Sequence, residues 1–116
     1  MPLTRRLILY FDHSFGNSVS QDDQPLTVNE GSASSIINCK YSTSYSSYYL
    51  FWYRQYPQKP LEFLIRKYSD GSEHKSNSAD RRFSSDLNTS QKKFTLTIKD
   101  LQLSDSAVYY CGLWEA

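Results

Sequence analysis

Near its carboxyl end the 116-residue sequence reads Asp105-Ser106-Ala107-Val108-Tyr109-Tyr110-Cys111. Ala107, Tyr109 and Cys111 share one parity, and side chains two positions apart in a β-strand lie on the same face. The pattern therefore predicts a strand from Ala107 to about Leu113, with Cys111 on its inner face.

The chain has two cysteines, Cys39 and Cys111, separated by 72 positions. This spacing matches neither a redox pair nor a zinc site. We therefore expect a long-range disulfide formed in an oxidising compartment, which would stabilise the fold by about 4 kcal/mol. The alternative is two small apolar thiols in the core.

Upstream, short segments of alternating apolar and polar residues are separated by turn residues, which is typical of a β-sandwich or barrel. Ile37, Cys39 and Tyr41 share one parity and predict a strand of about eight residues. The segment 50–56 predicts a second strand, with Leu50 and Trp52 on its inner face. Further strands are expected at residues 61–68, 82–87 and 94–98, and Asp70-Gly71 predicts a hairpin turn.

The composition argues against several classes of protein. With 13 basic and 12 acidic residues the formal charge is +1, which leaves no cationic surplus to neutralise the phosphates of a nucleic acid. No apolar run approaches the roughly 20 residues that span a bilayer. His13 and His74 have no partner at metal-ligand spacing, and no catalytic set or glycine-rich phosphate loop is recognisable. We expect neither an enzyme nor a cofactor or metal site.

Cys39, Trp52 and Cys111 together indicate the fold. A cysteine on an early strand, a tryptophan on the next and a cysteine on a late strand is the arrangement of immunoglobulin domains, where the indole packs against an inter-sheet disulfide. Tyr109 stands at the tyrosine-corner position, two residues before Cys111. With these residues in place, the segment 21–113 resembles the variable domains of T-cell receptors, most of all the alpha/delta type.

The resemblance implies an all-β fold: an immunoglobulin V-type antiparallel β-sandwich with Greek-key connections, covering residues 21–116. It also implies an ion pair between Arg82 and Asp105 across the bottom of the sandwich. The motifs that carry it are Trp52-Tyr53-Arg54-Gln55-Tyr56-Pro57, Pro60-Leu61-Glu62-Phe63-Leu64-Ile65, Arg82-Phe83-Ser84 and the stretch 101–111.

After Cys111 the sequence gives only Gly112-Leu113-Trp114-Glu115-Ala116. Rearranged relatives continue into a final strand with a Phe-Gly-x-Gly motif, so the chain resembles a germline variable segment without a joining region. We expect a sandwich that lacks the final strand and exposes unpaired backbone groups beside the strand ending at Leu113. Such a chain would be marginally stable and prone to self-association.

Binding in this architecture is expected at loops held by the sandwich. The segment 42–49 contains only Ser, Thr and Tyr, the composition of recognition loops. The second loop would span residues 68–74, and the third would begin at Gly112. Trp114 would be either a ligand anchor or an apolar residue exposed by the missing strand. The candidate ligand contacts are Tyr45, Tyr48, Tyr49, Tyr68, Asp70, Ser72, Glu73, Leu113 and Trp114.

A second surface is predicted on the outer face of the sheet that contains Trp52. Parity places Tyr53, Gln55, Phe63 and Tyr110 there, and clustered exposed aromatic residues indicate a protein interface. The resemblance implies pairing with a second variable domain, from a beta or gamma-type chain. Gln55 would bond its counterpart, with Pro60 and Leu61 packing beside it.

The resemblance further implies that the ligand is a peptide held by a histocompatibility molecule or a similar protein. Signalling would belong to associated subunits of a receptor at the extracellular side of the plasma membrane. Asn88-Thr89-Ser90 is a glycosylation sequon in an expected turn. Residues 1–20 resemble an atypical leader, because the apolar run 7–11 is shorter than that of a secretory signal. The alternatives are a disordered segment, an ordered extra strand or a cloning remnant.

Three other identities stay open. The chain could be an innate V-set receptor that binds a surface ligand without gene rearrangement, an antibody light-chain variable domain, or an adhesion module. The genomic sequence after the codon of Ala116 would separate the first from a rearranging receptor, because only the rearranging gene carries a recombination signal there.

Overall fold

The computed structural model describes residues 6–9, 13–14, 17–21 and 34–115, the first three ranges as backbone. Its strands are β1 (Arg6–Leu9), β2 (His13–Ser14), β3 (Asn17–Gln21), β4 (Ser34–Ser42), β5 (Tyr48–Gln55), β6 (Glu62–Tyr68), β7 (Glu73–Lys75), β8 (Phe83–Asn88), β9 (Lys93–Lys99) and β10 (Val108–Glu115). A short 3-10 helix, η1, spans Leu103–Asp105.

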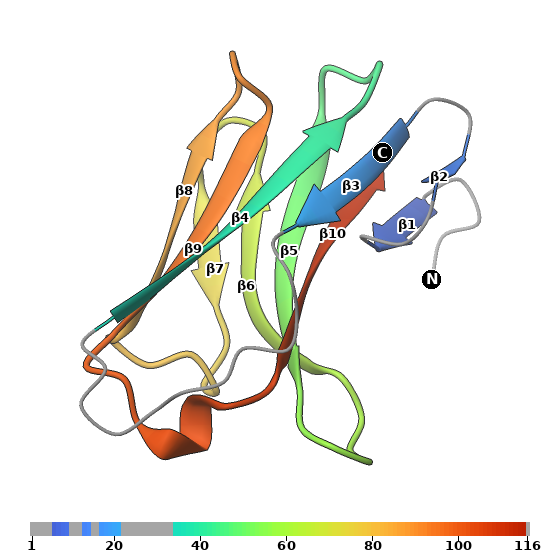
Figure 1. The fold of residues 1–116 in the computed structure, drawn as a ribbon. Coiled ribbons are helices and arrows are strands. Elements are labelled where there is room, and N and C mark those ends of the chain that lie inside the picture. Colours follow the sequence, from blue (N-terminus) through green and yellow to red (C-terminus); the bar gives the residue numbers. More distant parts are fainter. Residues whose placement is uncertain (1–5, 10–12, 15–16, 22–33, 116) are drawn as a thin grey trace.

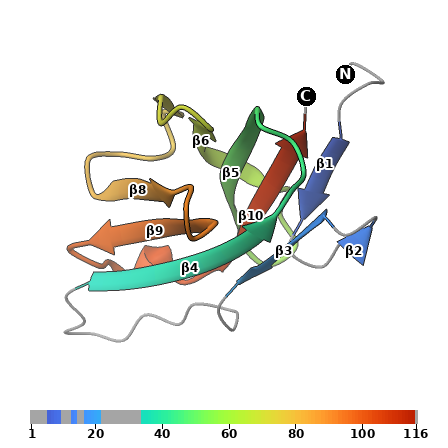
Figure 2. The same cartoon turned by 90° about the horizontal axis from the view of Figure 1, so that it is seen from above.

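The strands form two antiparallel sheets that face each other (Figures 1 and 2). One sheet has the order β1-β10-β5-β6-β7, and the other has the order β2-β3-β4-β9-β8. The chain changes sheet between β1 and β2, between β4 and β5, between β7 and β8, and between β9 and β10. The predicted antiparallel sandwich with Greek-key connections is confirmed.

Alternation of side chains builds the core. In β9, Phe94, Leu96 and Ile98 are fully buried while the residues between them are partly accessible. Because β4 and β10 alternate in the same way, the inner faces of both sheets meet across one apolar layer. Among the hydrophobic residues of 34–115, those with no exposed surface are Cys39, Leu50, Trp52, Leu64, Ile65, Phe94, Leu96, Ile98, Tyr109, Cys111 and Leu113.

A disulfide joins the two sheets at the centre of this core, between Cys39 on β4 and Cys111 on β10. Trp52 lies directly opposite Cys111 in the pairing of β5 with β10, and its ring stacks on Phe94 of the other sheet at 5.5 Å. The predicted disulfide is confirmed, and the indole stands beside it.

The register of β5 and β6 shifts at one point. Trp52 pairs with Ile65 and Tyr53 pairs with Phe63, so Leu64 is an extra residue in β6. Such a bulge reverses the alternation beyond it. Leu64 and Ile65 are both buried as a result, and Arg66 shares the outer face with Phe63.

The outer edge of β10 differs from the expectation. Residues Gly112–Glu115 pair antiparallel with β1, so this part of β10 has a neighbour on both sides (Figure 2). The expected row of unpaired backbone groups beside the end of this strand is therefore wrong for the described structure. Strands β1 and β2, and all of β3 except Gln21, fall in the segment 1–20, which the sequence placed outside the domain.

The end of β10 also differs from the expectation. The strand continues through Leu113 and Trp114 to Glu115, where a recognition loop was predicted from Gly112. Pairing with both β1 and β5 satisfies the backbone of these residues and keeps them extended. Trp114 is half-buried, with its ring 6.0 Å from that of Phe51, so it is not exposed by a missing strand.

Candidate functional site

The loop between β4 and β5 displays Tyr45 at one end of the sandwich. Tyr45 is 47% exposed, and its backbone N–H donates to Thr43 Oγ1 at 3.1 Å. Thr43 Oγ1 in turn donates to the buried carboxylate of Glu115 at 2.6 Å. The loop is therefore attached to the end of β10, a link that alternation and composition did not predict.

Two predicted ligand contacts are buried instead. The Tyr48 hydroxyl shares a 2.7 Å hydrogen bond with the Tyr41 hydroxyl, and the Lys92 ammonium lies over both rings. Leu113 has no exposed surface because it lies in the core. Both side chains are enclosed and present no surface to a ligand, so their assignment as contacts is wrong for this structure.

The second loop is the turn between β6 and β7. Gly71 has a φ of +97°, a conformation that favours glycine, as the Asp70-Gly71 motif predicts. The Asp70 carboxylate accepts from the Ser72 backbone N–H and hydroxyl at 2.8 and 2.7 Å. These hydrogen bonds lower the pKa of Asp70, so the exposed turn carries a fixed negative charge.

The second loop is joined to the first. The Ser69 N–H donates to the Tyr48 carbonyl at 3.0 Å, and the Tyr48 N–H donates to Ser69 Oγ at 3.3 Å. Because the first residue of β5 and the residue directly after β6 are hydrogen-bonded to each other, the two loops form one surface at this end of the sandwich.

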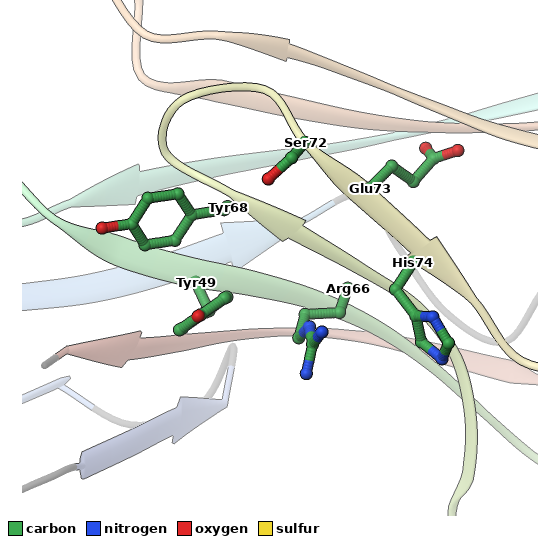
Figure 3. A pocket seen from close by; sticks show the side chains of 6 residues that line it. All are labelled: Tyr49, Arg66, Tyr68, Ser72, Glu73 and His74. Carbon is green, nitrogen blue, oxygen red and sulfur yellow. The ribbon is translucent and has the colours of Figure 1, made fainter.

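A pocket of about 150 Å³ opens beside this surface (Figure 3). Four of the predicted ligand contacts line it: Tyr49, Tyr68, Ser72 and Glu73. Sequence reasoning missed the other two, Arg66 and His74. Regular alternation along β6, counted from the outward-facing Phe63, would place the Arg66 side chain on the inner face. The bulge at Leu64 shifts the alternation by one residue, so Arg66 lies on the outer face instead.

The outer face of β5, β6 and β10 carries the predicted aromatic surface. Phe51 is only 8% exposed although it faces away from the core, because the rings of Tyr49, Tyr53, Phe63 and Trp114 surround it at 5.8–6.3 Å. Burial among them raises the pKa of Tyr53. This cluster is a second apolar layer outside the core.

The remaining predicted interface residues lie on the part of this face toward the turn between β5 and β6. Gln55 is half-buried and donates from Nε2 to the Lys59 carbonyl at 2.9 Å. Tyr110 is half-buried, opposite Tyr53 in the pairing of β10 with β5. Pro60 and Leu61 are exposed, with Leu61 at 42%.

At the opposite end of the sandwich, Arg82 and Asp105 form a bidentate pair. Arg82 Nη1 and Nη2 donate to the two carboxylate oxygens of Asp105 at 2.8 and 3.0 Å, and Asp105 is 1% exposed. Burial alone would raise the pKa of Asp105, but the hydrogen bonds from Arg82 and from the Gln102 N–H lower it.

The same corner anchors Tyr109. Its hydroxyl donates to the Asp105 carbonyl at 2.7 Å, four residues upstream, which is the geometry of a tyrosine corner. Burial raises the pKa of Tyr109 to about 12. The 3-10 helix is thus held by hydrogen bonds to both its backbone and its side chain.

Asn88 of the predicted sequon ends β8 and is exposed. Ser90 Oγ donates to Asn88 Oδ1 at 2.8 Å, so the hydroxyl of the third sequon residue contacts the amide. The position is accessible to a modifying enzyme.

Comparison with known proteins agrees with this geometry. The profile of the immunoglobulin V-set domain matches residues 21–116. The human T cell receptor alpha variable 18 is 41% identical over 92% of this chain and 90% of its own length. The human T cell receptor alpha variable 40 is 42% identical over the same shares, and the human T cell receptor alpha variable 38-2/delta variable 8 is 35% identical over 87% and 84%. The chain belongs to the immunoglobulin V-set family, among the T-cell receptor alpha/delta variable domains.

T-cell receptor variable segments belong to membrane receptors with an extracellular domain, and their V-set family is not enzymatic. Across residues 34–115 of this V-set domain, no three His, Cys, Asp or Glu side chains are grouped so that they could hold a metal ion. No helix in the described part of the chain is long and apolar enough to cross a membrane.

Proposed function

We propose that this V-set domain is the antigen-recognition unit of an alpha or delta-type receptor chain. It pairs through the outer face of β5, β6 and β10 with a second variable domain, from a beta or gamma-type chain. Its loop end contacts a protein ligand, such as a peptide held by a histocompatibility molecule. The receptor stands at the plasma membrane with this domain outside, and its associated subunits carry the signal.

The observation that supports pairing most is the aromatic layer around Phe51. A monomer gains little by building an apolar cluster on the solvent side of a sheet, whereas a protein interface has an aromatic centre and a polar rim. Tyr53, Phe63 and Tyr110 extend the cluster toward Gln55 and Leu61, which provide amide and apolar groups at its border.

Gln55 would change partner on pairing. Its Nε2 donor is used by the Lys59 carbonyl in the single chain. A bond to a glutamine of the second domain would replace this contact at little net cost, because one hydrogen bond is exchanged for another.

Co-expression with beta and gamma-type chains tests the proposal. Changing both Tyr53 and Tyr110 to Asp places two charges in the apolar interface and should abolish co-purification of the partner chain. The matched control is Ile36→Asp, because Ile36 is 59% exposed on β4 of the other sheet. Normal assembly of the double variant, with its fold retained by circular dichroism, would refute the pairing surface.

Asn88 is proposed as a glycosylation site. Protein secreted from mammalian cells should lose mass on treatment with an N-glycosidase, and the Asn88→Gln variant should show no such change. An identical mass before and after treatment of the unmodified sequence would dismiss the site.

A further inference from the structure

The pocket beside the second loop contains one guanidinium, that of Arg66, which forms no ion pair with the described residues. Arg66 is exposed on β6, and its guanidinium lies over the Tyr49 ring at 5.3 Å from the ring centroid. The ring of Tyr68 packs against that of Tyr49 at 4.8 Å and forms the neighbouring wall (Figure 3).

The bulge at Leu64 and the pairing of β6 with β7 fix the position of this cation. Arg66 stands directly opposite His74, whose ring stacks on Phe63 at 6.1 Å. The floor of the pocket is therefore aromatic and held by the layer around Phe51. An arginine supported by an aromatic surface loses little side-chain freedom when it binds an anion.

The two nearby carboxylates do not neutralise Arg66. Glu73 lies on the other side of β7 from His74, where its carboxylate pairs with Lys67 at 3.2 Å and accepts from Ser85 Oγ at 2.5 Å. Figure 3 shows the Glu73 side chain directed away from Arg66 and His74. Asp70 is bound by Ser72 within the turn.

We infer that this pocket is a subsite for a single carboxylate, the side chain of an aspartate or glutamate on the protein ligand. The inference rests on the proposed function and specifies one contact of its loop end. The guanidinium supplies two parallel donors that match the two oxygens of a carboxylate, and His74 and the tyrosines complete the walls. A pocket of about 150 Å³ has room for such a side chain, given that one water occupies about 30 Å³.

The charges near the pocket favour a monoanion over phosphate. Asp70 carries a fixed negative charge because hydrogen bonds lower its pKa, and Glu73 stands at the rim. The charge of Glu73 is already paired with Lys67, and Arg66 is the one Lys or Arg side chain among the residues that line the pocket. A single guanidinium matches one carboxylate, and the negative charge of the neighbouring Asp70 opposes a dianion. The position of the pocket, adjoining the turn 69–72, indicates a group on the protein ligand rather than on the paired variable domain.

Nuclear magnetic resonance of the full chain, labelled with ¹⁵N, tests the subsite. The probes are N-acetyl-aspartate N-methylamide and its neutral isostere, N-acetyl-asparagine N-methylamide. The aspartate derivative should shift the Nε–Hε signal of Arg66 with saturation in the millimolar range, and the asparagine derivative should not. Arg66→Gln should weaken binding about fivefold or more, and Arg66→Lys should weaken it less, because a lysine keeps the charge but loses the bidentate geometry.

The matched control is Arg81→Gln, because Arg81 is also exposed but lies outside the pocket. It should bind the aspartate derivative like the unmodified chain. Equal responses to both derivatives, unchanged binding by the Arg66→Gln variant, or tighter binding of inorganic phosphate would each overturn the assignment. A chain that pairs with a partner but ignores the aspartate derivative contradicts this inference alone. A chain that binds the derivative but never pairs contradicts only the proposed function.

Discussion

Thr43 and Glu115 are 72 positions apart and are joined by a 2.6 Å hydrogen bond from the threonine hydroxyl to the carboxylate. The same hydroxyl accepts the N–H of Tyr45. One oxygen thus connects the exposed first loop to the buried end of β10, so the loop surface is attached to the sheet that would bind a second domain.

Thr43→Val should loosen the first loop and destabilise the domain. The variant removes a donor from the buried carboxylate of Glu115, which costs about 1–3 kcal/mol of the free energy of unfolding. Chemical denaturation measures this loss, and amide exchange at Tyr45 should become faster. Thr89→Val, at an exposed turn, should change neither quantity. An unchanged exchange rate at Tyr45 would show that the hydrogen bond does not order the loop.

Asp105→Asn should destabilise the domain strongly. It removes the bidentate carboxylate partner of the largely buried Arg82 guanidinium and leaves only the more exposed carboxylate of Asp80 at 3.3 Å. This costs about 3 kcal/mol and lowers the Tm by about 10 °C. The control is Asp86→Asn at an exposed position of β8, which should change the Tm little. Equal melting temperatures for the two variants would mean that the ion pair contributes no net stability.

The lowered pKa of the Asp105 carboxylate predicts that the domain loses stability in acid. The pKa of Asp105 is lowered in the folded chain, so its ionised form stabilises the fold fully above about pH 4. That contribution is lost as the pH falls through the lowered folded pKa, because protonation then occurs more readily in the unfolded chain. Denaturant titrations between pH 7 and pH 2.5 should show a steeper loss for the unmodified chain than for Asp105→Asn. Parallel profiles would contradict the assignment.

The raised pKa of Tyr109 predicts that the domain also loses stability in alkali. Its pKa is raised to about 12 in the folded chain, from an ordinary value of 10. A raised pKa gives stability that is complete below pH 10 and is lost as the pH rises toward 12, because the unfolded chain ionises first. Tyr109→Phe should cost about 1 kcal/mol at neutral pH, through the lost bond to the Asp105 carbonyl. It should then lose less than the unmodified chain between pH 10 and 12, and a steeper loss in the variant would refute the account.

The pairing of β1 with β10 should keep the chain from associating with other copies of itself. Because it pairs with Gly112–Glu115, it covers an edge that would otherwise accept a strand from another molecule. Deleting residues 1–12 should therefore increase the light scattered at a given protein concentration. The control deletes residues 1–5 and leaves β1 intact. Equal scattering from both deletions would show that β1 does not protect the edge.

Much of the fold could be predicted from local pattern alone. Alternation around Ile37, Cys39 and Tyr41, and again around Phe94, Leu96 and Ile98, places these residues on inner faces without any tertiary information. The Cys39, Trp52 and Cys111 spacing selects the sandwich, and Asp70-Gly71 marks the hairpin. These predictions are confirmed because each depends on a local rule or on a covalent bond.

The positions of the surface residues could not be predicted from local pattern alone. Tyr48 resembles a recognition residue by composition, but its contact with Tyr41 buries it, and Leu113 became a core residue because β10 continues between two neighbouring strands. Arg66 lies in the pocket only because one extra residue at Leu64 turns it outward. The sequence by itself determined the two layers, their disulfide and the strands β4, β5, β6, β8, β9 and β10, since these follow from periodicity and spacing. Only the tertiary structure decided which tyrosines, and which arginine, reach the surface, because strand register and neighbouring strands are set by contacts between segments far apart in the chain.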